Sequence, residues 1–297
     1  MINFLKYRQI YLAISLAVLV PGVYSLLNWG LKPSIDFSGG TVVEITNYEL
    51  GITNLEDKLK EKNVEIESIR QDNDIITVRT KPIDRSVWEE VKTELATESA
   101  QLQTEESTAS AGLEELRFET VGPVLGKELL NKTLIAASIA IVVILLYVAW
   151  AFKSVTYGIS AVIALFHDVL VVTGTFSLLG HFFGVEVDVL FVTALLTTMS
   201  FSVHDTIVVF DRIRESIRTE KLPFDATINK ALSETMSRSV NNSMTIIFML
   251  LALVLLGGDT VKWFAVALLI GTISGTYSSP FVATPILYLL QSRKHGN

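Results

Sequence analysis

Long apolar runs separated by charged connections dominate the pattern of this 297-residue chain. A helix that crosses a membrane needs about 20 predominantly apolar residues. Six runs meet this requirement, at about 9–28, 133–152, 155–180, 188–210, 240–257 and 261–289. The pattern therefore predicts an α-helical membrane protein with six transmembrane helices.

The first run reads as a membrane anchor, because Val20-Pro21-Gly22-Val23 and Asn28 extend it to spanning length and no small-residue cleavage site follows. Composition agrees with a membrane protein, since 50% of the residues are apolar. The chain has no cysteine, which excludes disulfides and thiolate metal sites.

Between the first two runs, residues 29–132 have the pattern of a small α+β domain. Alternating and β-branched residues predict strands at 41–46, 64–71, 74–81 and 113–121. A helix is predicted at 53–62, with Thr53 as N-cap and Glu56 completing a capping box, and a second one from Asp84 to about Leu95. The order β-α-β-β-α-β is that of a ferredoxin-like domain of about 85 residues.

This segment is strongly acidic, with 12 Lys and Arg against 21 Asp and Glu, a net charge of −9. Nucleic acid is therefore not an expected partner, because it requires a basic face. Residues 97–111 are rich in Ser, Thr, Glu, Gln and Ala and read as a mobile insertion or a helix extension. No histidine precedes Asn131, so binding or leverage fits this domain better than catalysis.

Lys and Arg in short connections are retained on the cytoplasmic side during insertion. Four connections or ends carry such residues: Lys6 and Arg8; Lys153; Arg212, Arg214, Arg218, Lys221, Lys230 and Arg238; Arg293 and Lys294. The opposite short loops hold only Lys262. We therefore predict cytoplasmic termini, with boundaries at 1–30 for the first helix, 31–130 for the extracytoplasmic domain, 131–290 for helices two to six and 291–297 for the tail.

Enzyme motifs are weak in this chain. Residues 122–127 resemble a phosphate loop, but only three residues separate the glycines and Glu128 follows the lysine. The segment 271–275 has a serine between small residues without protease spacing, and such small residues usually indicate close helix packing. We expect no cofactor and no enzymatic activity, so any energy should come from an ion gradient.

Asp205 lies inside the fourth apolar run, where an ionised carboxylate costs at least about 2.5 to 3.5 kcal/mol. Such a residue is normally paired, or protonated in a working cycle; the alternative is an Asp that pins one helix to its neighbour. Other polar residues in the runs complete a candidate proton pathway: His167, Asp168, His204, Arg238, Asn241, Asn242 and Ser243. The alternatives are a self-satisfied His167–Asp168 pair and an Arg238 that only anchors the membrane edge.

Several segments together resemble the SecD/SecF family of bacterial protein translocation, within the resistance-nodulation-division superfamily. The resemblance to its SecF branch covers essentially the whole chain. It rests on residues 35–40 (IDFSGG), 121–123 (VGP), 164–168 (ALFHD) and 205–215 (DTIVVFDRIRE). Ser34 and His204 depart from the residues that we expect in the family.

The resemblance implies a six-helix subunit of the bacterial inner membrane that pairs with SecD in a pseudo-symmetric twelve-helix bundle. It implies that proton motive force assists preprotein translocation beside the SecYEG channel and other Sec subunits. The family's fourth-helix Asp and fifth-helix Arg match Asp205 and Arg238. We further expect a cytoplasmic-end ion pair of Asp211 with Arg212, near Arg214 and Glu215, and a hinge at 36–40 that includes Asp36, Phe37, Gly39 and Gly40.

Two other functions stay open at this point. One is half of a proton-driven small-molecule exporter, which would need larger extracytoplasmic domains with an aromatic-lined pocket. The other is a structural clamp of the translocase that conducts nothing. The coupling ion, H⁺ or Na⁺, also stays open, because both use carboxylates.

Overall fold

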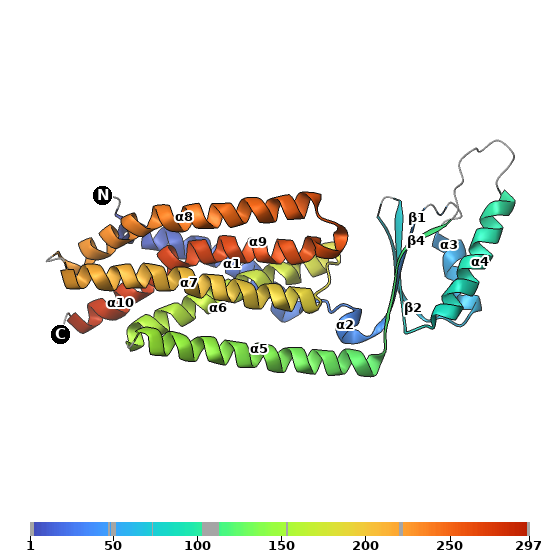
Figure 1. Ribbon diagram of the computed structural model, residues 1–297, viewed down its shortest axis with the longest axis horizontal. Coiled ribbons are helices and arrows are strands. Elements are labelled where there is room, and N and C mark those ends of the chain that lie inside the picture. Colours follow the sequence, from blue (N-terminus) through green and yellow to red (C-terminus); the bar gives the residue numbers. More distant parts are fainter. Residues whose placement is uncertain are drawn as a thin grey trace. The chain divides into compact units, whose positions relative to one another are not determined.

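The computed structural model describes residues 3–46, 48, 52–72, 74–102, 113–152, 154–219 and 222–295. The chain divides into two compact units (Figure 1). Unit 1 consists of Met1–Lys32 and Leu134–Asn297 and is helical, whereas unit 2 consists of Pro33–Thr133 and contains the sheet.

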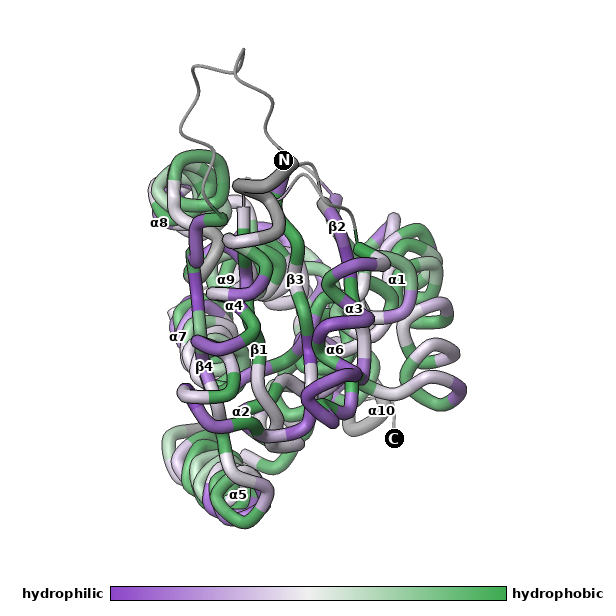
Figure 2. The backbone as a smooth tube through the Cα atoms, turned by 90° about the vertical axis from the view of Figure 1, so that its right-hand side faces the viewer, coloured by the Kyte–Doolittle hydropathy of each residue, from purple (hydrophilic) through white to green (hydrophobic). Residues whose placement is uncertain are grey.

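Six helical segments of the described chain are long and apolar enough to cross a membrane, in agreement with the predicted number. The C-terminal turns of α8, which are nearest the viewer in Figure 2, are largely hydrophobic. The elements are η1 (Phe4–Tyr7), α1 (Arg8–Asn28), α5 (Pro123–Phe152), α6 (Val155–Phe183), α7 (Val189–Thr219), α8 (Phe224–Leu256), α9 (Asp259–Ser278), η2 (Ser279–Ala283) and α10 (Thr284–His295). The last predicted span corresponds to α9, η2 and α10. Pro280 lies in the π-helical turn η2, where its ring nitrogen cannot donate the regular backbone hydrogen bond of a helix.

Three helices extend further than hydropathy predicted. Helix α5 begins at Pro123, α7 continues to Thr219, and α8 begins at Phe224. The polar first half of α8 is held by packing, because Ile228 and Leu232, spaced four apart, are fully buried against neighbouring helices. Arg212, Arg214, Arg218, Lys230 and Arg238 therefore lie on helices and not in a connection, while Lys153 and Lys221 lie outside the described residues.

Helices α1 and α6 pack backbone against backbone. A Cβ atom on Gly174 would lie 2.7 Å from the Cα atom of Gly22. One turn further, the hydroxyls of Ser25 and Ser177 are 2.6 Å apart. Small residues let membrane helices approach closely, and this contact fixes α1 against the helix that carries His167 and Asp168.

Replacing Gly174 by Val should therefore separate α1 from α6. The added methyl groups would overlap the backbone of Gly22, and this clash cannot be relieved by rotating a side chain. We expect a lower thermal unfolding midpoint in detergent. Gly158→Val is the matched control, because a Cβ atom there meets nothing within 4 Å; equal midpoints for the two variants would contradict the expectation.

Unit 2 contains the predicted element order β-α-β-β-α-β, preceded by the one-turn helix α2 (Ile35–Ser38). Its elements are β1 (Gly40–Thr46), α3 (Ile52–Glu61), β2 (Ile66–Asp72), β3 (Ile75–Thr80), α4 (Arg85–Leu102) and β4 (Glu114–Val121). The strands form one antiparallel sheet in the order β2-β3-β1-β4, in which Val43 of β1 lies opposite both Val78 and Phe118.

Helices α3 and α4 cover one face of this sheet (Figure 1). Their fully buried residues pack on apolar residues of the strands: Leu55, Leu59, Trp88, Val91 and Leu95. The N-cap prediction for Thr53 was wrong, because α3 already begins at Ile52. Helix α4 continues to Leu102, and the rest of the predicted insertion, residues 103–111, lies outside the described residues.

Residues 36–40 form a tight turn. Ser34 caps α2 by accepting from the backbone N–H of Asp36 at 3.2 Å. Gly39 and Gly40 have φ angles of +75° and +130°, and a Cβ atom on Gly39 would lie 2.8 Å from the Cα atom of Pro123. Only glycine fits both requirements. This geometry gives the glycines a packing role, and a hinge here stays a prediction.

Glu115 of β4 links the sheet to α4 through charged hydrogen bonds. Arg85 donates to its two oxygens at 2.5 and 3.1 Å, and Trp88 Nε1 donates at 2.8 Å. Burial alone would raise the pKa of the Glu115 carboxyl, but the hydrogen bonds from Trp88 and Arg85 outweigh burial and lower that pKa.

A carboxyl with a lowered folded-state pKa stabilises the fold above its unfolded-state pKa, and this contribution is lost as pH falls through the folded-state value. In the excised segment 34–121, Glu115→Gln should therefore lower the unfolding free energy at neutral pH by roughly 1 to 3 kcal/mol. The difference from the parent should shrink at acidic pH. Urea titrations at both pH values test this, and a difference that does not change with pH would contradict it.

Candidate functional site

Asp205 lies within α7, half-buried and facing α8 and α9. It lines a cavity of about 20 Å³ together with Ser202 and His204 from its own helix. The other walls come from α8 and α9: Asn242, Ser243, Ile246, Gly271, Thr272, Gly275 and Thr276. Among the described residues, no hydrogen-bond or ion-pair partner contacts the Asp205 carboxylate. Keeping this carboxylate ionised inside an apolar helix therefore costs free energy.

Asp168, in the middle of α6, has the opposite environment. Its side chain is 4% exposed and accepts hydrogen bonds from serines of two other helices. Ser202 of α7 and Ser278 of α9 donate to Oδ2 at 2.5 and 2.6 Å, and Ser274 of α9 donates to Oδ1 at 2.6 Å. We call these three hydroxyls the serine cradle. It satisfies the carboxylate and ties α6, α7 and α9 together.

His167 completes this cluster. Its Nδ1 lies 3.0 Å from Asp168 Oδ1, and its side chain is 7% exposed. The predicted His167–Asp168 pair is thus present, but the serines contribute more hydrogen bonds to Asp168 than the imidazole does.

Ser202 connects the two carboxylates. Its hydroxyl donates to Asp168, and the same residue lines the cavity of Asp205. Sequence reasoning missed the serine cradle because serine is common in helices and its hydroxyl usually bonds to the helix backbone. The available signal was the spacing of Ser274 and Ser278, four residues apart on a face with Gly271 and Gly275.

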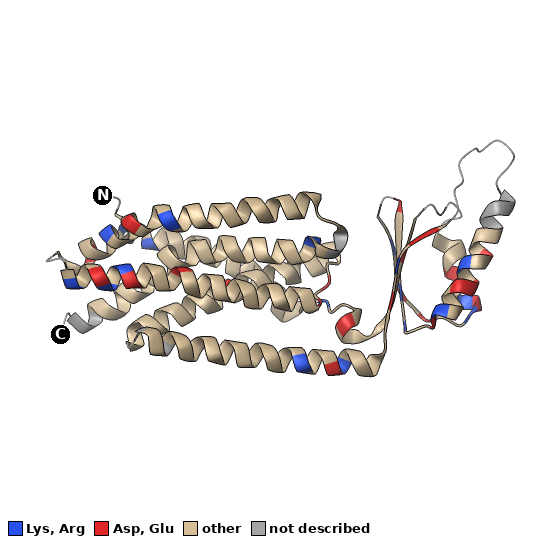
Figure 3. Ribbon diagram, viewed as in Figure 1, with Lys and Arg blue, Asp and Glu red and all other residues tan. Residues whose placement is uncertain are grey.

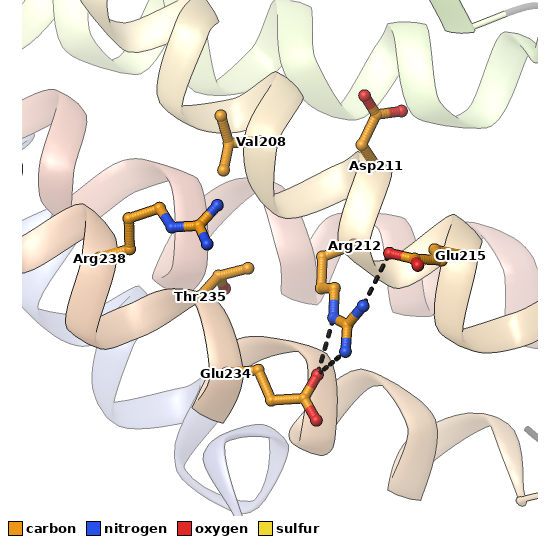
Figure 4. A pocket seen from close by; sticks show the side chains of 7 residues that line it. All are labelled: Val208, Asp211, Arg212, Glu215, Glu234, Thr235 and Arg238. Atoms are coloured by element: carbon orange, nitrogen blue, oxygen red, sulfur yellow. Dashed lines mark hydrogen bonds and ion pairs between the residues drawn. The ribbon is translucent and has the colours of Figure 1, made fainter.

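Arg238 lines a different site from Asp205. It borders a groove of about 600 Å³ between α7 and α8, which we call the charged groove (Figure 4). The other lining residues are Val208, Asp211, Arg212, Glu215, Glu234 and Thr235. Val208 follows Asp205 by one helical turn, and Asn242 of the Asp205 cavity follows Arg238 by one turn. The charged groove and the Asp205 cavity are therefore consecutive along the α7–α8 contact.

The charges of this groove gather at the end of unit 1 where both chain termini lie (Figure 3). The predicted pair of Asp211 with Arg212 was wrong. Adjacent helix residues do not face each other, whereas residues three apart do. Asp211 accepts from Arg214 at 2.6 Å, and Arg212 pairs with Glu215 at 2.7 Å and Glu234 at 2.5 Å. Within the described chain, Arg238 has no ion-pair partner.

His204 and Asn241 are exposed, and His204 also borders the Asp205 cavity. In the described residues, no group of three or more His, Asp or Glu could hold a metal ion. The arrangement places the Asp205 carboxyl beside Ser202, which donates a hydrogen bond to the second carboxyl, Asp168, and Asp168 contacts the His167 imidazole.

Three comparisons place the chain among known proteins. Residues 101–293 match the family model "Protein export membrane protein SecD/SecF, C-terminal". The chain is 44% identical to protein translocase subunit SecF of Thermobaculum terrenum, over 97% of this chain and 93% of that protein. It is 38% identical to SecF of Anaerolinea thermophila, over 100% and 96% of the two chains.

A larger protein and its crystal structure also match. The chain is 34% identical to protein translocase subunit SecDF of Thermus thermophilus, over 94% of this chain and 37% of that protein. The crystal structure of SecDF from that organism, described as a translocon-associated membrane protein, aligns with a TM-score of 0.78 at 32% identity. That alignment covers 98% of this chain and 39% of SecDF, so this chain spans about two fifths of the fused protein.

Proposed function

The chain belongs to the SecF family of protein translocase subunits, and we propose that it uses the proton motive force, together with SecD, to assist preprotein translocation. The observation that carries the proposal is Asp205, a half-buried carboxylate without a described partner inside a transmembrane helix. Protonation removes the cost of an ionised carboxylate at that position. If the proton is taken up on one side of the membrane and released on the other, its movement down the gradient supplies the energy.

In this proposal Asp205 is the proton carrier. His204 precedes it and is exposed, and Arg238, in the adjoining charged groove, is the cation that favours the ionised form. His167 and Asp168 belong to the same pathway through Ser202. The Arg212–Glu234 ion pair joins the end of α7 to α8 beside the charged groove, whereas the Asp211–Arg214 and Arg212–Glu215 pairs lie within α7.

The partner in this proposal is SecD, which supplies the remaining helices of a twelve-helix bundle. The matched protein that is fused as SecDF supports this partnership. We further propose contacts with SecYEG and with the emerging preprotein. Unit 2, a ferredoxin-like domain in this proposal, lies outside the cytoplasmic membrane of a bacterium, and both termini lie in the cytoplasm.

An export assay in vesicles that contain SecD and this chain tests the function. We expect preprotein transport to depend on an imposed proton gradient in the absence of Na⁺. Dependence on a Na⁺ gradient alone would identify Na⁺ as the coupling ion. Transport that responds to neither gradient would favour the structural clamp, and efflux of small molecules in place of protein would favour the exporter.

The proposed topology predicts which engineered cysteines can be labelled from outside intact cells. The chain has no cysteine of its own, and both Asp74 and Arg218 are exposed. An impermeant thiol reagent should modify Asp74→Cys in unit 2 but not Arg218→Cys at the end of α7. The reverse labelling pattern would reject the proposed orientation.

Segment 34–121 should fold when it is expressed alone, because it has its own apolar core under α3 and α4. We expect a soluble monomer with the far-ultraviolet circular dichroism of a mixed α/β protein. A spectrum of unstructured chain would show that the segment depends on the rest of the protein.

A further inference from the structure

A second groove in unit 1 has no role in the function described so far. It has a volume of about 430 Å³ and lies between α1, α6, η2 and α10. Most of its walls are apolar, including Leu12, Leu16, Leu19, Phe166, Leu170 and Val282. Ligand pockets in proteins have a similar size and a similar lining, with many apolar side chains and few polar groups. We call it the apolar groove.

The apolar groove has the length of one membrane leaflet. Along α1 its lining residues run from Arg8 to Leu19, a length of about 16 Å at a rise of about 1.5 Å per residue. This is about half of the hydrocarbon thickness of a bilayer. Beyond Leu19 and Leu170, α1 and α6 pack backbone against backbone at Gly22 and Gly174, so the groove ends there. A lipid chain ends at the same depth, whereas a helix of SecD would cross both leaflets.

Arg8 provides a positive charge at the outer end of the groove, where both chain termini lie (Figure 1). It is exposed, and no carboxylate of the described residues forms an ion pair with it. Its guanidinium carbon lies 5.8 Å from the centre of the Tyr288 ring of α10. This cation–π contact uses the face of the ring and leaves the N–H donors of the guanidinium for other partners. A planar guanidinium matches the oxygens of a phosphate group.

The deeper part of the groove offers a ligand little polar surface. Ser15 bonds to the hydroxyl of Tyr277 at 3.5 Å. Nδ1 of His167 lies 3.0 Å from Asp168 Oδ1, and its Nε2 is buried. A ligand that fits the groove is therefore apolar along most of its length and polar at the Arg8 end.

We propose that the apolar groove binds one phospholipid of the cytoplasmic leaflet, with an acyl chain along α1 and an anionic headgroup at Arg8. The choice of leaflet rests on the proposed topology, in which both chain termini are cytoplasmic. Anionic lipids are present in that leaflet, and basic pockets between transmembrane helices on the cytoplasmic side bind their headgroups. The length of the groove, its apolar inner walls and the charge at its outer end all agree with this occupant.

Photo-crosslinking tests the headgroup. Vesicles that contain SecD and this chain are made from equal parts of phosphatidylcholine and phosphatidylglycerol, with a trace of either lipid that carries a diazirine in one acyl chain. The phosphatidylglycerol probe should label the groove walls roughly fivefold more than the phosphatidylcholine probe, the preference expected from one basic residue at an anionic headgroup. Arg8→Gln should lose this preference. Lys6→Gln is the matched control and should keep it, because Lys6 is exposed near the same end but does not line the groove.

A second pair of variants tests the acyl chain. Positions 16 and 18 of α1 are similarly exposed, at 48% and 47%, but only Leu16 lines the groove. The larger side chain of Leu16→Trp should fill the groove and lower the labelling of its α6 wall severalfold. Val18→Trp should leave this labelling at the parent yield. Equal yields for the two variants would place the lipid chain outside the groove and overturn the proposal.

Three further results would also overturn it. Equal labelling by the two probes would mean that the groove does not select an anionic headgroup. Loss of the preference in Lys6→Gln as well would indicate a general attraction of anionic lipid to this end of the chain. No labelling of the groove walls by either probe would mean that another protein segment of the complex covers them. Export is not measured, so a failure of the proposed proton-driven function would leave the labelling yields unchanged.

Discussion

Replacing Asp205 by Asn should leave assembly with SecD intact and abolish the dependence of protein export on the proton gradient. Asparagine has nearly the same shape and can take the same place in the wall of the 20 Å³ cavity. It cannot bind and release a proton in this pH range, so the coupling between gradient and movement is lost. Asp205→Glu should retain part of the coupling, because the carboxyl survives with a longer reach.

The measurement is gradient-dependent export in vesicles, combined with co-purification of SecD to confirm assembly. Asp225→Asn is the matched control, since it removes an exposed carboxylate from the first turn of α8 outside the candidate site. We expect the control to export at the parent rate. If Asp205→Asn also does so, Asp205 is a packing residue and the structural clamp describes the protein better.

Hydropathy predicted the six spans because a bilayer requires long apolar segments, whatever the tertiary contacts. It could not predict that α8 begins at Phe224. The first half of this helix is polar, and its buried residues, such as Ile228 and Leu232, become apparent only where they pack. The single residue Asp205 was identifiable for a related reason: a carboxylate in an apolar run requires an explanation even when its neighbours are unknown.

The environment of the site was less predictable. The sequence indicated that His167 and Asp168 could satisfy each other, but three serines from α7 and α9 provide most of the hydrogen bonds. The pattern of residues in one sequence does not show which helices pack against each other. Arg238 was expected to be the cation that alternates with Asp205, and this stays a prediction. It borders the charged groove, which follows the Asp205 cavity along the α7–α8 contact, and the sequence could not show how these two helices are aligned.

The serine cradle leads to the second large expected effect, the loss of stability when Asp168 is replaced by Ala. The carboxylate accepts bonds from three buried hydroxyls and the imidazole, and each polar group left without a partner costs roughly 1 to 3 kcal/mol. Ser278 can partly recover through the Gly275 carbonyl, at 3.3 Å, so the total should be smaller than the sum. We expect a thermal unfolding midpoint in detergent that is lower by several degrees.

Asp168→Asn distinguishes the structural part of this effect from the loss of charge. The amide keeps one oxygen as an acceptor, and a serine hydroxyl can rotate to accept from the new N–H group. Its unfolding midpoint should therefore lie between those of the parent and Asp168→Ala. If both variants unfold at the parent midpoint, the three helices are held by their apolar contacts, and the buried carboxylate is present for its chemistry alone.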